Sequence, residues 1–309
     1  MPVSYQWQQR MERWKRATSG FLGGGGGNGS QPRPKLCPAC GTLVGIGATR
    51  CHECGANLRF SLAAVSKGLS GFFGGEAPAS TAILVVNVVL FIATVIIGLA
   101  RGGGGGGFGL LFGASQEALF RLGMGVPVDS GYFSWYRLFT AVYLHGGLIH
   151  IGFNMMVLLD IGPVVEEVYG SARFFFIYTV CGLVGALAST FVGKHFSVGA
   201  SGAILGLIGV LIAITTRRSG AMMRELRGRL ISWVVTIFAI GLFFGGLRTD
   251  NWAHFGGFAA GFVLGKLFSD RQPATAQERN AAYILGWGAL VAVLAAFAMM
   301  LLHFSQPLQ

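Results

Sequence analysis

The chain has 309 residues, a mean hydropathy of +0.61, and charged side chains at only 11% of positions. Apolar runs of membrane-spanning length recur from about residue 81 to the C-terminus, which excludes an ordinary soluble domain and predicts a polytopic helical membrane protein. The formal net charge is +11. Because a basic face beside anionic lipid explains this charge, we expect the lipid bilayer as a partner and expect no nucleic acid.

Residues 1–34 are basic and rich in glycine, with a glycine tract at 23–27 that predicts a flexible tether. The first 20 residues carry cations such as Arg10 and Lys15 but no apolar run, so we expect no cleavable signal peptide.

Residues 35–60 contain two CxxC pairs separated by ten residues. This spacing suits four thiolates around one tetrahedral Zn²⁺ and predicts a small structural zinc ribbon. The alternative is a redox dithiol, but a thioredoxin-like site needs a much longer domain. We expect the ribbon to be structural or to bind a cytoplasmic partner, and residues 61–80 to be a linker. The expected zinc ligands are Cys37, Cys40, Cys51 and Cys54.

Seven apolar runs are predicted to be membrane helices, and the Lys and Arg residues between them predict their orientation. With a cytoplasmic N-terminus, 18 of the 23 Lys and Arg residues fall on the cytoplasmic side, as the positive-inside rule requires. The connection from residue 101 to about 143 then lies outside, and its length is typical of a functional segment. The runs cover roughly residues 81–100, 147–165, 174–193, 198–216, 230–247, 252–268 and 282–304.

Four polar side chains are expected at a similar depth near the outer surface, because the second, fourth and sixth runs all enter from that side. His150 and Asn154 share one face of the second run, Ser201 begins the fourth, and His254 begins the sixth. Such groups are costly in a bilayer. A hydroxyl beside an imidazole forms a nucleophile with its general base, so this arrangement favours catalysis.

Glycines at helical spacing accompany this pair. Gly257 and Gly261 follow His254, and Gly202 follows Ser201. Glycine stripes let two helices approach at backbone contact, which would bring the hydroxyl and the imidazole within hydrogen-bond reach. Taken singly, glycine and serine are also ordinary packing residues of membrane helices, so the prediction depends on the combination.

These residues resemble the rhomboid family of intramembrane serine proteases, over about residues 135–266. The run Gly199-Ala200-Ser201-Gly202 matches the GxSG nucleophile motif of that family, and His254 matches its general base. The sequence departs from the family pattern at Leu205, where an aromatic residue often stacks on the histidine. The further matches are His145, His150 and Asn154 in an HxxxxHxxxN run, Tyr136-Arg137 in place of Trp-Arg, and Gly162, Glu166 and Gly170 in a GxxxExxxG run.

The resemblance implies an all-α bundle of six helices over residues 81–270, with an additional helix and tail over 271–309. Within the additional helix, Gly286 is expected to lie outside the core. Ser201 and His254 are the implied catalytic dyad, and His150 and Asn154 the implied oxyanion groups. The implied structural residues are His145, Arg137, Glu166, Gly199, Gly202, Gly257 and Gly261.

The implied function is a serine endopeptidase that cuts single-pass transmembrane proteins near the outer membrane face. It needs no cofactor for catalysis, so the expected Zn²⁺ is structural only. We expect a multi-pass protein of a bacterial plasma (inner) membrane. Asp250, four residues before His254, is an alternative third catalytic member. The alternative functions are a proteolytically inactive rhomboid-like scaffold, which the retained polar residues disfavour, and a transporter, which would show repeated halves.

Overall fold

The computed structural model of the chain contains two compact units, Met1–Lys67 and Gly68–Gln309, and each is considered by itself. The residues that the structure describes are 35–36, 43–44, 49, 52, 77–101, 111, 113–194, 196–243 and 249–305.

The first unit contains one small antiparallel sheet. Strand β1 (Lys35–Leu36) pairs with β2 (Leu43–Val44), and Lys35 lies opposite Val44. In the sequence these strands bracket the first CxxC pair. The four expected zinc ligands, Cys37, Cys40, Cys51 and Cys54, lie outside the described residues, so the zinc ribbon stays a prediction.

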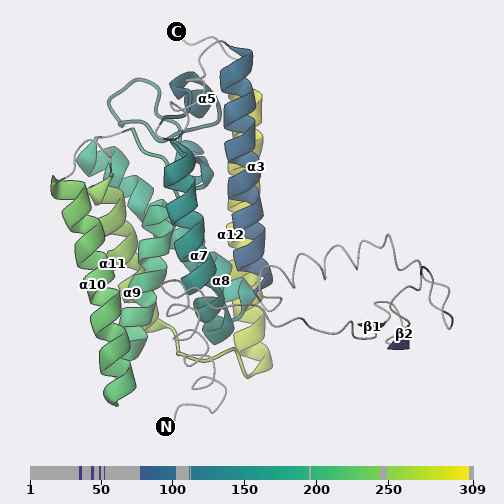
Figure 1. Cartoon of the computed structure of the whole chain (residues 1–309), viewed down its shortest axis with the longest axis vertical. Helices are drawn as coiled ribbons and strands as arrows, with labels where there is room; N and C mark the ends of the chain where they lie inside the picture. Colours follow the sequence, from purple (N-terminus) through teal and green to yellow (C-terminus); the bar gives the residue numbers. More distant parts are fainter. Residues whose placement is uncertain are drawn as a thin grey trace, which may run out of the picture. The chain divides into compact units, whose positions relative to one another are not determined.

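All the described elements of the second unit are helical (Figure 1). Its long helices correspond to the seven apolar runs, and the described part of the connection between α3 and α7 contains the short helices α5, α6 and η1. The long helices are α3 (Pro78–Ala100), α7 (Leu148–Tyr169), α8 (Ser171–Leu187), α9 (Ser201–Arg217), α10 (Ala221–Phe243), α11 (Asn251–Leu267) and α12 (Ala276–His303); the π-helix η2 (Ala188–Gly193) continues α8, and the short helices are α5 (Gln116–Arg121), α6 (Arg137–Thr140) and η1 (Ala141–Tyr143).

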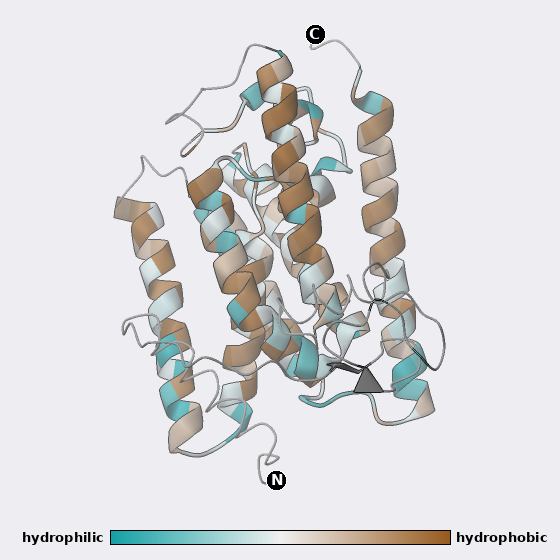
Figure 2. Cartoon of the chain, turned by 45° about the vertical axis from the view of Figure 1, so that its right-hand side comes forward, coloured by the Kyte–Doolittle hydropathy of each residue, from teal (hydrophilic) through white to brown (hydrophobic). Residues whose placement is uncertain are grey.

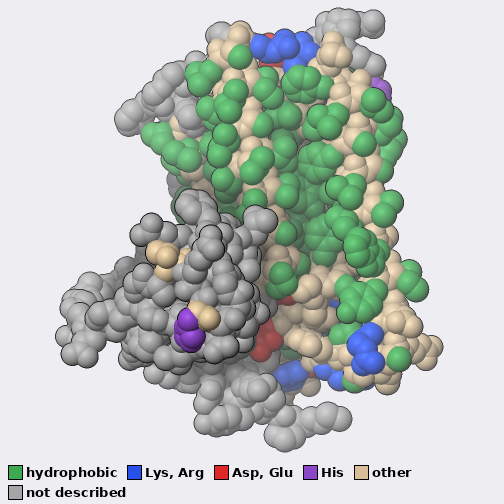
Figure 3. Space-filling view, turned by 90° about the vertical axis from the view of Figure 1, so that its right-hand side faces the viewer, with side chains coloured by type: hydrophobic (Ala, Val, Ile, Leu, Met, Phe, Trp, Pro, Cys, Tyr) green, Lys and Arg blue, Asp and Glu red, His purple; other side chains and the backbone are tan. Residues whose placement is uncertain are grey.

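Five described helical stretches are long and apolar enough to cross a membrane, namely α3, α7, α8 with η2, α10 and α12. Helix α9 is apolar but shorter, and α11 also has only 17 residues. Apolar residues dominate the middle of the helices in Figure 2, and a hydrophobic belt separates charged ends in Figure 3. The predicted architecture, a helical protein with several membrane-spanning helices, is therefore confirmed.

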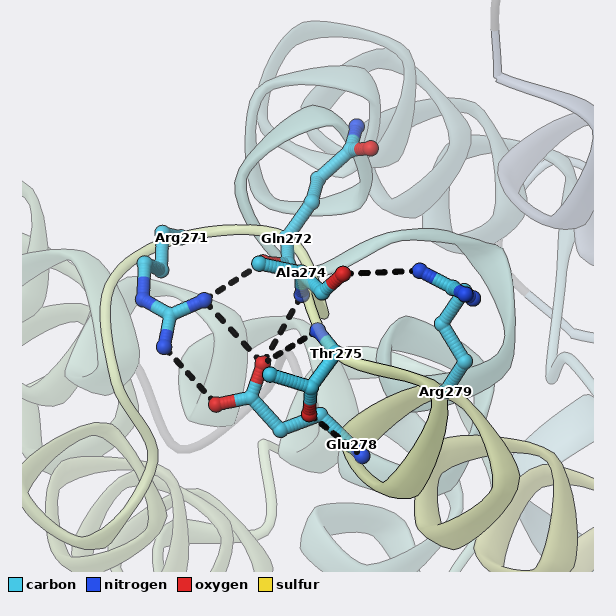
Figure 4. A network of polar contacts seen from close by, with 6 residues as sticks. All are labelled: Arg271, Gln272, Ala274, Thr275, Glu278 and Arg279. Atoms are coloured by element: carbon cyan, nitrogen blue, oxygen red, sulfur yellow. Dashed lines mark hydrogen bonds and ion pairs between the residues drawn. The ribbon is translucent and has the colours of Figure 1, made fainter.

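Two helices begin earlier than hydropathy predicts, because their first turns are polar. Helix α10 begins at Ala221 instead of near residue 230, and α12 begins at Ala276 instead of near 282. The start of α12 is fixed by a capping box (Figure 4), in which the Thr275 hydroxyl accepts from the backbone N–H of Glu278. The Glu278 carboxylate accepts from the backbone N–H of Thr275 and pairs with Arg271 at 2.7 Å.

Helix α9 occupies the centre of the bundle, in contact with α7, α8, α10 and α11. Its closest partner is α11, and glycines make this contact possible. A Cβ built on Gly257 or Gly261 would collide with the backbone carbonyl of Gly202 or Gly206, respectively. The two backbones are therefore in direct contact along the glycine faces.

Gly286 lies on the additional helix α12, outside the six core helices as expected, but it is closely packed against one of them. A Cβ on Gly286 would lie 2.9 Å from both Cβ and the carbonyl oxygen of Ala172, so α12 packs closely on the start of α8. At its other end α12 contributes Ala296 and Met300 to a buried cluster with the connection before α7. Its neighbour Gly288 faces open space among the described residues.

Candidate active site

The turn before α9 presents Ser201 as the first residue of that helix. Gly199 adopts φ +131°, a conformation that other residues rarely adopt, and its N–H donates to the Ala141 carbonyl of η1 at 2.9 Å. A Cβ on Gly199 would lie 2.8 Å from His150 Nε2. This position therefore needs glycine for its backbone conformation and for the space beside the imidazole.

Ser201 and His254 form a hydrogen-bonded pair. Their Oγ and Nε2 atoms are 2.9 Å apart, and His254 is only 4% exposed. The carbonyl oxygen of Ala253 would lie 2.6 Å from a Cβ on Gly185 of α8 and 3.0 Å from one on Gly202 of α9. Glycines on two neighbouring helices thus hold the start of α11 close to the hydroxyl of Ser201.

Asp250 does not bind the imidazole of His254 in this structure. One of its carboxylate oxygens accepts from the backbone N–H of Ala253 at 3.0 Å, which caps α11, and the other accepts from the Ser189 hydroxyl of η2. Among the described residues His254 Nδ1 has no hydrogen-bond partner. The geometry is therefore that of a pair, with Asp250 fixing the helix that carries the histidine.

Two contacts near the site were not predicted from the sequence. The ring of Phe238, on α10, meets the His254 ring edge-on, with centroids 6.1 Å apart. The π-helix η2 brings Ser189 to Asp250. Neither residue belongs to a spaced motif. The only signal for Phe238 was indirect: Leu205 stands where the family often has an aromatic residue against the histidine, so another ring could take that place.

The imidazole of His150 lies beside the turn at Gly199, and Asn154 lies one helical turn further along α7. His150 Nδ1 accepts from the Gly146 N–H at 3.3 Å, so the proton of a neutral ring is on Nε2, the edge that faces Gly199. The Asn154 amide donates to the His150 carbonyl at 3.0 Å. His150 therefore offers an N–H donor next to Ser201.

Of the sequence-predicted structural residues outside the glycines, His145 lies beside this site, and Arg137 and Glu166 fix other parts of the bundle. His145 is fully buried, with its ring 5.1 Å from that of His150. Arg137 donates to the carbonyls of Phe120 and Met124 at 2.9 and 3.0 Å, which fixes the connection between α3 and α7. Glu166 lies at the opposite end of α7.

Glu166 joins the end of α7 to the start of α3. Its two carboxylate oxygens accept from the backbone N–H groups of Ala79 and Ser80 at 2.9 and 2.8 Å, and from the Ser80 hydroxyl at 2.8 Å. With 2% exposure, this carboxylate satisfies the free N–H groups that begin α3.

Two contacts join the segment between α5 and α6 to the segment between η2 and α9. Gly125 and Ser197 form an isolated antiparallel bridge, and Lys194 pairs with Asp129 at 2.6 Å. The hydrogen bond from Lys194 lowers the pKa of the Asp129 carboxyl below its ordinary value. Within the described part of the chain, no group of three or more His, Cys, Asp or Glu residues could hold a metal ion.

Comparison with known proteins identifies the relationship. Residues 132–271 match the family model described as the rhomboid domain. The chain is similar to rhomboid protease GluP of Bacillus subtilis (strain 168), with 35% identity over 151 residues, which is 49% of this chain and 27% of that protein. It is also similar to two proteins of Arabidopsis thaliana. RHOMBOID-like protein 5 is 38% identical over 42% of this chain and 43% of its own length, and RHOMBOID-like protein 1 is 33% identical over 60% and 52%.

The chain thus spans between about a quarter and about half of the length of these relatives. The matched region contains Ser201, His254, His150 and Asn154. Over residues 132–271 the chain therefore matches the rhomboid domain model, and it is similar in sequence to proteins described as rhomboid protease and RHOMBOID-like proteins.

Proposed function

We propose that this protein is an intramembrane serine endopeptidase that cleaves single-pass transmembrane proteins. The observation that carries the proposal is the 2.9 Å contact between Ser201 Oγ and His254 Nε2 within a rhomboid domain. The homology supports transmembrane proteins as substrates in general. The active side chains lie at the ends of α7, α9 and α11 that face one side of the bundle, so cleavage would occur near that membrane face.

In the first step, His254 Nε2 accepts the Ser201 hydroxyl proton while Oγ bonds to the scissile carbonyl carbon. The carbonyl oxygen becomes an oxyanion. The free backbone N–H groups at the start of α9 and the His150 Nε2–H group would stabilise this charge, together with the Asn154 amide. The protonated His254 then donates to the departing amine, the C–N bond breaks, and an acyl-enzyme remains.

In the second step, a water molecule attacks the acyl carbon, and His254 accepts one proton from it. The Ser201 oxygen leaves with a proton from His254, and the carboxylic acid product is released. This chemistry uses two titrating partners only and needs no cofactor. Asp250 acts in it by capping α11.

The wider assignment is also part of the proposal. The basic ends of the helices support a cytoplasmic N-terminus in a bacterial plasma (inner) membrane, with six core helices and α12 all crossing the bilayer. A Zn²⁺ ion held by Cys37, Cys40, Cys51 and Cys54 would fold the N-terminal ribbon, which would bind a cytoplasmic partner.

The first prediction tests the nucleophile. Ser201→Ala should abolish cleavage of a model transmembrane substrate and labelling by a fluorophosphonate probe, because no other described hydroxyl contacts His254. Thermal unfolding should change little, since only one small half-buried hydroxyl is lost. Ser197→Ala, in the loop before α9, is the matched control and should retain activity, because the contacts found for Ser197 with Gly125 use its backbone. Equal activity of Ser201→Ala and wild type would favour the inactive scaffold.

A further inference from the structure

The turn between α7 and α8 carries a buried cation that has no anionic partner among the described residues. Gly170 makes this turn in one residue, at φ +76°, and places Tyr169 and Arg173 on either side of it. Arg173 is 7% exposed, and its Nε and Nη1 atoms have no hydrogen-bond partner in the described structure. A buried, unpaired guanidinium is costly unless it has a partner.

The position of Arg173 in its helix increases this cost. It lies in the first turn of α8, where the helix dipole favours negative charge and disfavours a cation. Among the described residues its aromatic contact is the face of Phe268, 5.6 Å from the guanidinium carbon. A cation–π contact of this kind recovers only part of the lost hydration.

A second unpartnered donor lies beside the same ring. Tyr169 is fully buried, its ring centroid is 6.3 Å from that of Phe268, and its hydroxyl has no partner among the described residues. The phenol and the guanidinium therefore both border Phe268. Two buried groups that can both donate, with no acceptor supplied by the described chain, indicate an acceptor from outside the protein.

The neighbouring charged groups are already engaged. Arg217 donates to the carbonyls of Gly265 and Phe268, at 2.7 and 2.9 Å, and thereby caps α11. Arg218 pairs with Asp270 at 2.7 Å. That carboxylate is therefore occupied by Arg218, and the two arginines add positive charge close to the Gly170 turn.

We propose that this end of the bundle binds a phosphate group, namely the headgroup phosphate of an anionic phospholipid. A phosphate offers several acceptor oxygens, which suit both a guanidinium fork and a phenol hydroxyl. The Gly170 turn lies at the end of two membrane helices, where lipid headgroups are found. The excess of Lys and Arg at this end attracts anionic lipid in particular.

The test measures the thermal stability of the full-length protein in lipid nanodiscs. Discs of phosphatidylcholine alone are compared with discs that contain increasing fractions of phosphatidylglycerol. We expect phosphatidylglycerol to raise the melting temperature of the wild type. In Arg173→Met the half-saturating fraction should rise about tenfold, as expected for loss of a hydrogen bond to a charged group.

Arg224→Met is the matched control, because Arg224 is an exposed cation in the first turn of α10. It should keep the wild-type response. Equal losses in both variants would show diffuse electrostatic attraction and would overturn the proposal, as would no loss in either. If inorganic phosphate in lipid-free detergent reproduces the whole effect, the assignment to lipid is wrong.

A second variant covers the case in which Arg173→Met does not fold. Tyr169→Phe removes only the unpartnered hydroxyl and leaves the ring packed on Phe268. We expect it to fold and to need more phosphatidylglycerol for the same stabilisation. An unchanged lipid response in folded Tyr169→Phe and Arg173→Lys would overturn the proposal.

Discussion

The imidazole of His150 can act on a reacting carbonyl only through the hydrogen on Nε2. The Gly146 N–H occupies Nδ1, which fixes this tautomer in a neutral ring. The resulting donor faces the turn at Gly199, two residues before Ser201. Its hydrogen bond would strengthen as negative charge develops on the substrate oxygen, so it would stabilise the transition state more than bound substrate.

We therefore predict that His150→Ala lowers kcat by about 10² to 10³ and leaves KM nearly unchanged. The measurement is steady-state cleavage of a transmembrane substrate by the purified protein. His303→Phe is the control, because His303 ends α12 and stacks on Tyr136, a contact that a phenyl ring can keep. A rise in KM with unchanged kcat would contradict this prediction. It would show that His150 binds the substrate and the transition state equally well.

At the residue scale, sequence reasoning could identify the pair but not all of its surroundings. Ser201 and His254 are 53 positions apart, yet the order of the helices and the glycine spacing predict their approach. The contacts of Phe238 and Ser189 depend on how α10 and η2 pack, and neither residue belongs to a spaced motif. The widened turn of a π-helix also leaves no simple periodic signature.

Among the elements, the contact between α9 and α11 determines how closely Ser201 and His254 approach each other. Gly261 meets the backbone of Gly206 so closely that any side chain must push the helices apart. His254 is carried on the same helix, two turns away. A displacement of about 1 Å between reacting groups can lower a rate on the order of 10²-fold.

Gly261→Val should therefore lower kcat strongly while the side chains of Ser201 and His254 both remain present. Gly288→Val on α12 is the matched control, because a Cβ there meets no described atom within 4 Å. We expect the control to retain activity and melting temperature. Equal loss in the two variants would mean that valine disturbs membrane helices in general, and that the contact with α9 has no special role.

Packing partners were harder to predict than helices. Hydropathy located all seven long helices, because burial in lipid requires long apolar runs. It did not indicate that Gly286 would pack against Ala172, since a glycine facing a helix and a glycine facing lipid look alike in one sequence. The polar first turns of α10 and α12 were missed because they add no hydropathy.

For the whole molecule, the chain divides into two compact units, Met1–Lys67 and Gly68–Gln309, and we predict that the helical unit folds without the N-terminal one. The start of α3 is fixed by contacts that lie within the helical unit itself. Glu166 needs the backbone N–H groups of Ala79 and Ser80, and the Thr81 N–H donates to the Ala77 carbonyl. A chain that begins at Ala77 keeps all of these contacts, whereas a chain that begins at Leu84 loses them.

We predict that the chain beginning at Ala77 folds in detergent and cleaves a simple transmembrane substrate at close to the full-length rate. The double change Cys37→Ser with Cys40→Ser should release Zn²⁺ from the full-length protein without loss of that activity. The chain beginning at Leu84 should be less stable, because a buried carboxylate without partners costs about 1–3 kcal/mol or more. Zinc content, melting temperature and cleavage rate are measured on the same preparations. If the chain beginning at Ala77 is folded but inactive, the N-terminal unit takes part in catalysis, and the separation of the two units holds for folding alone.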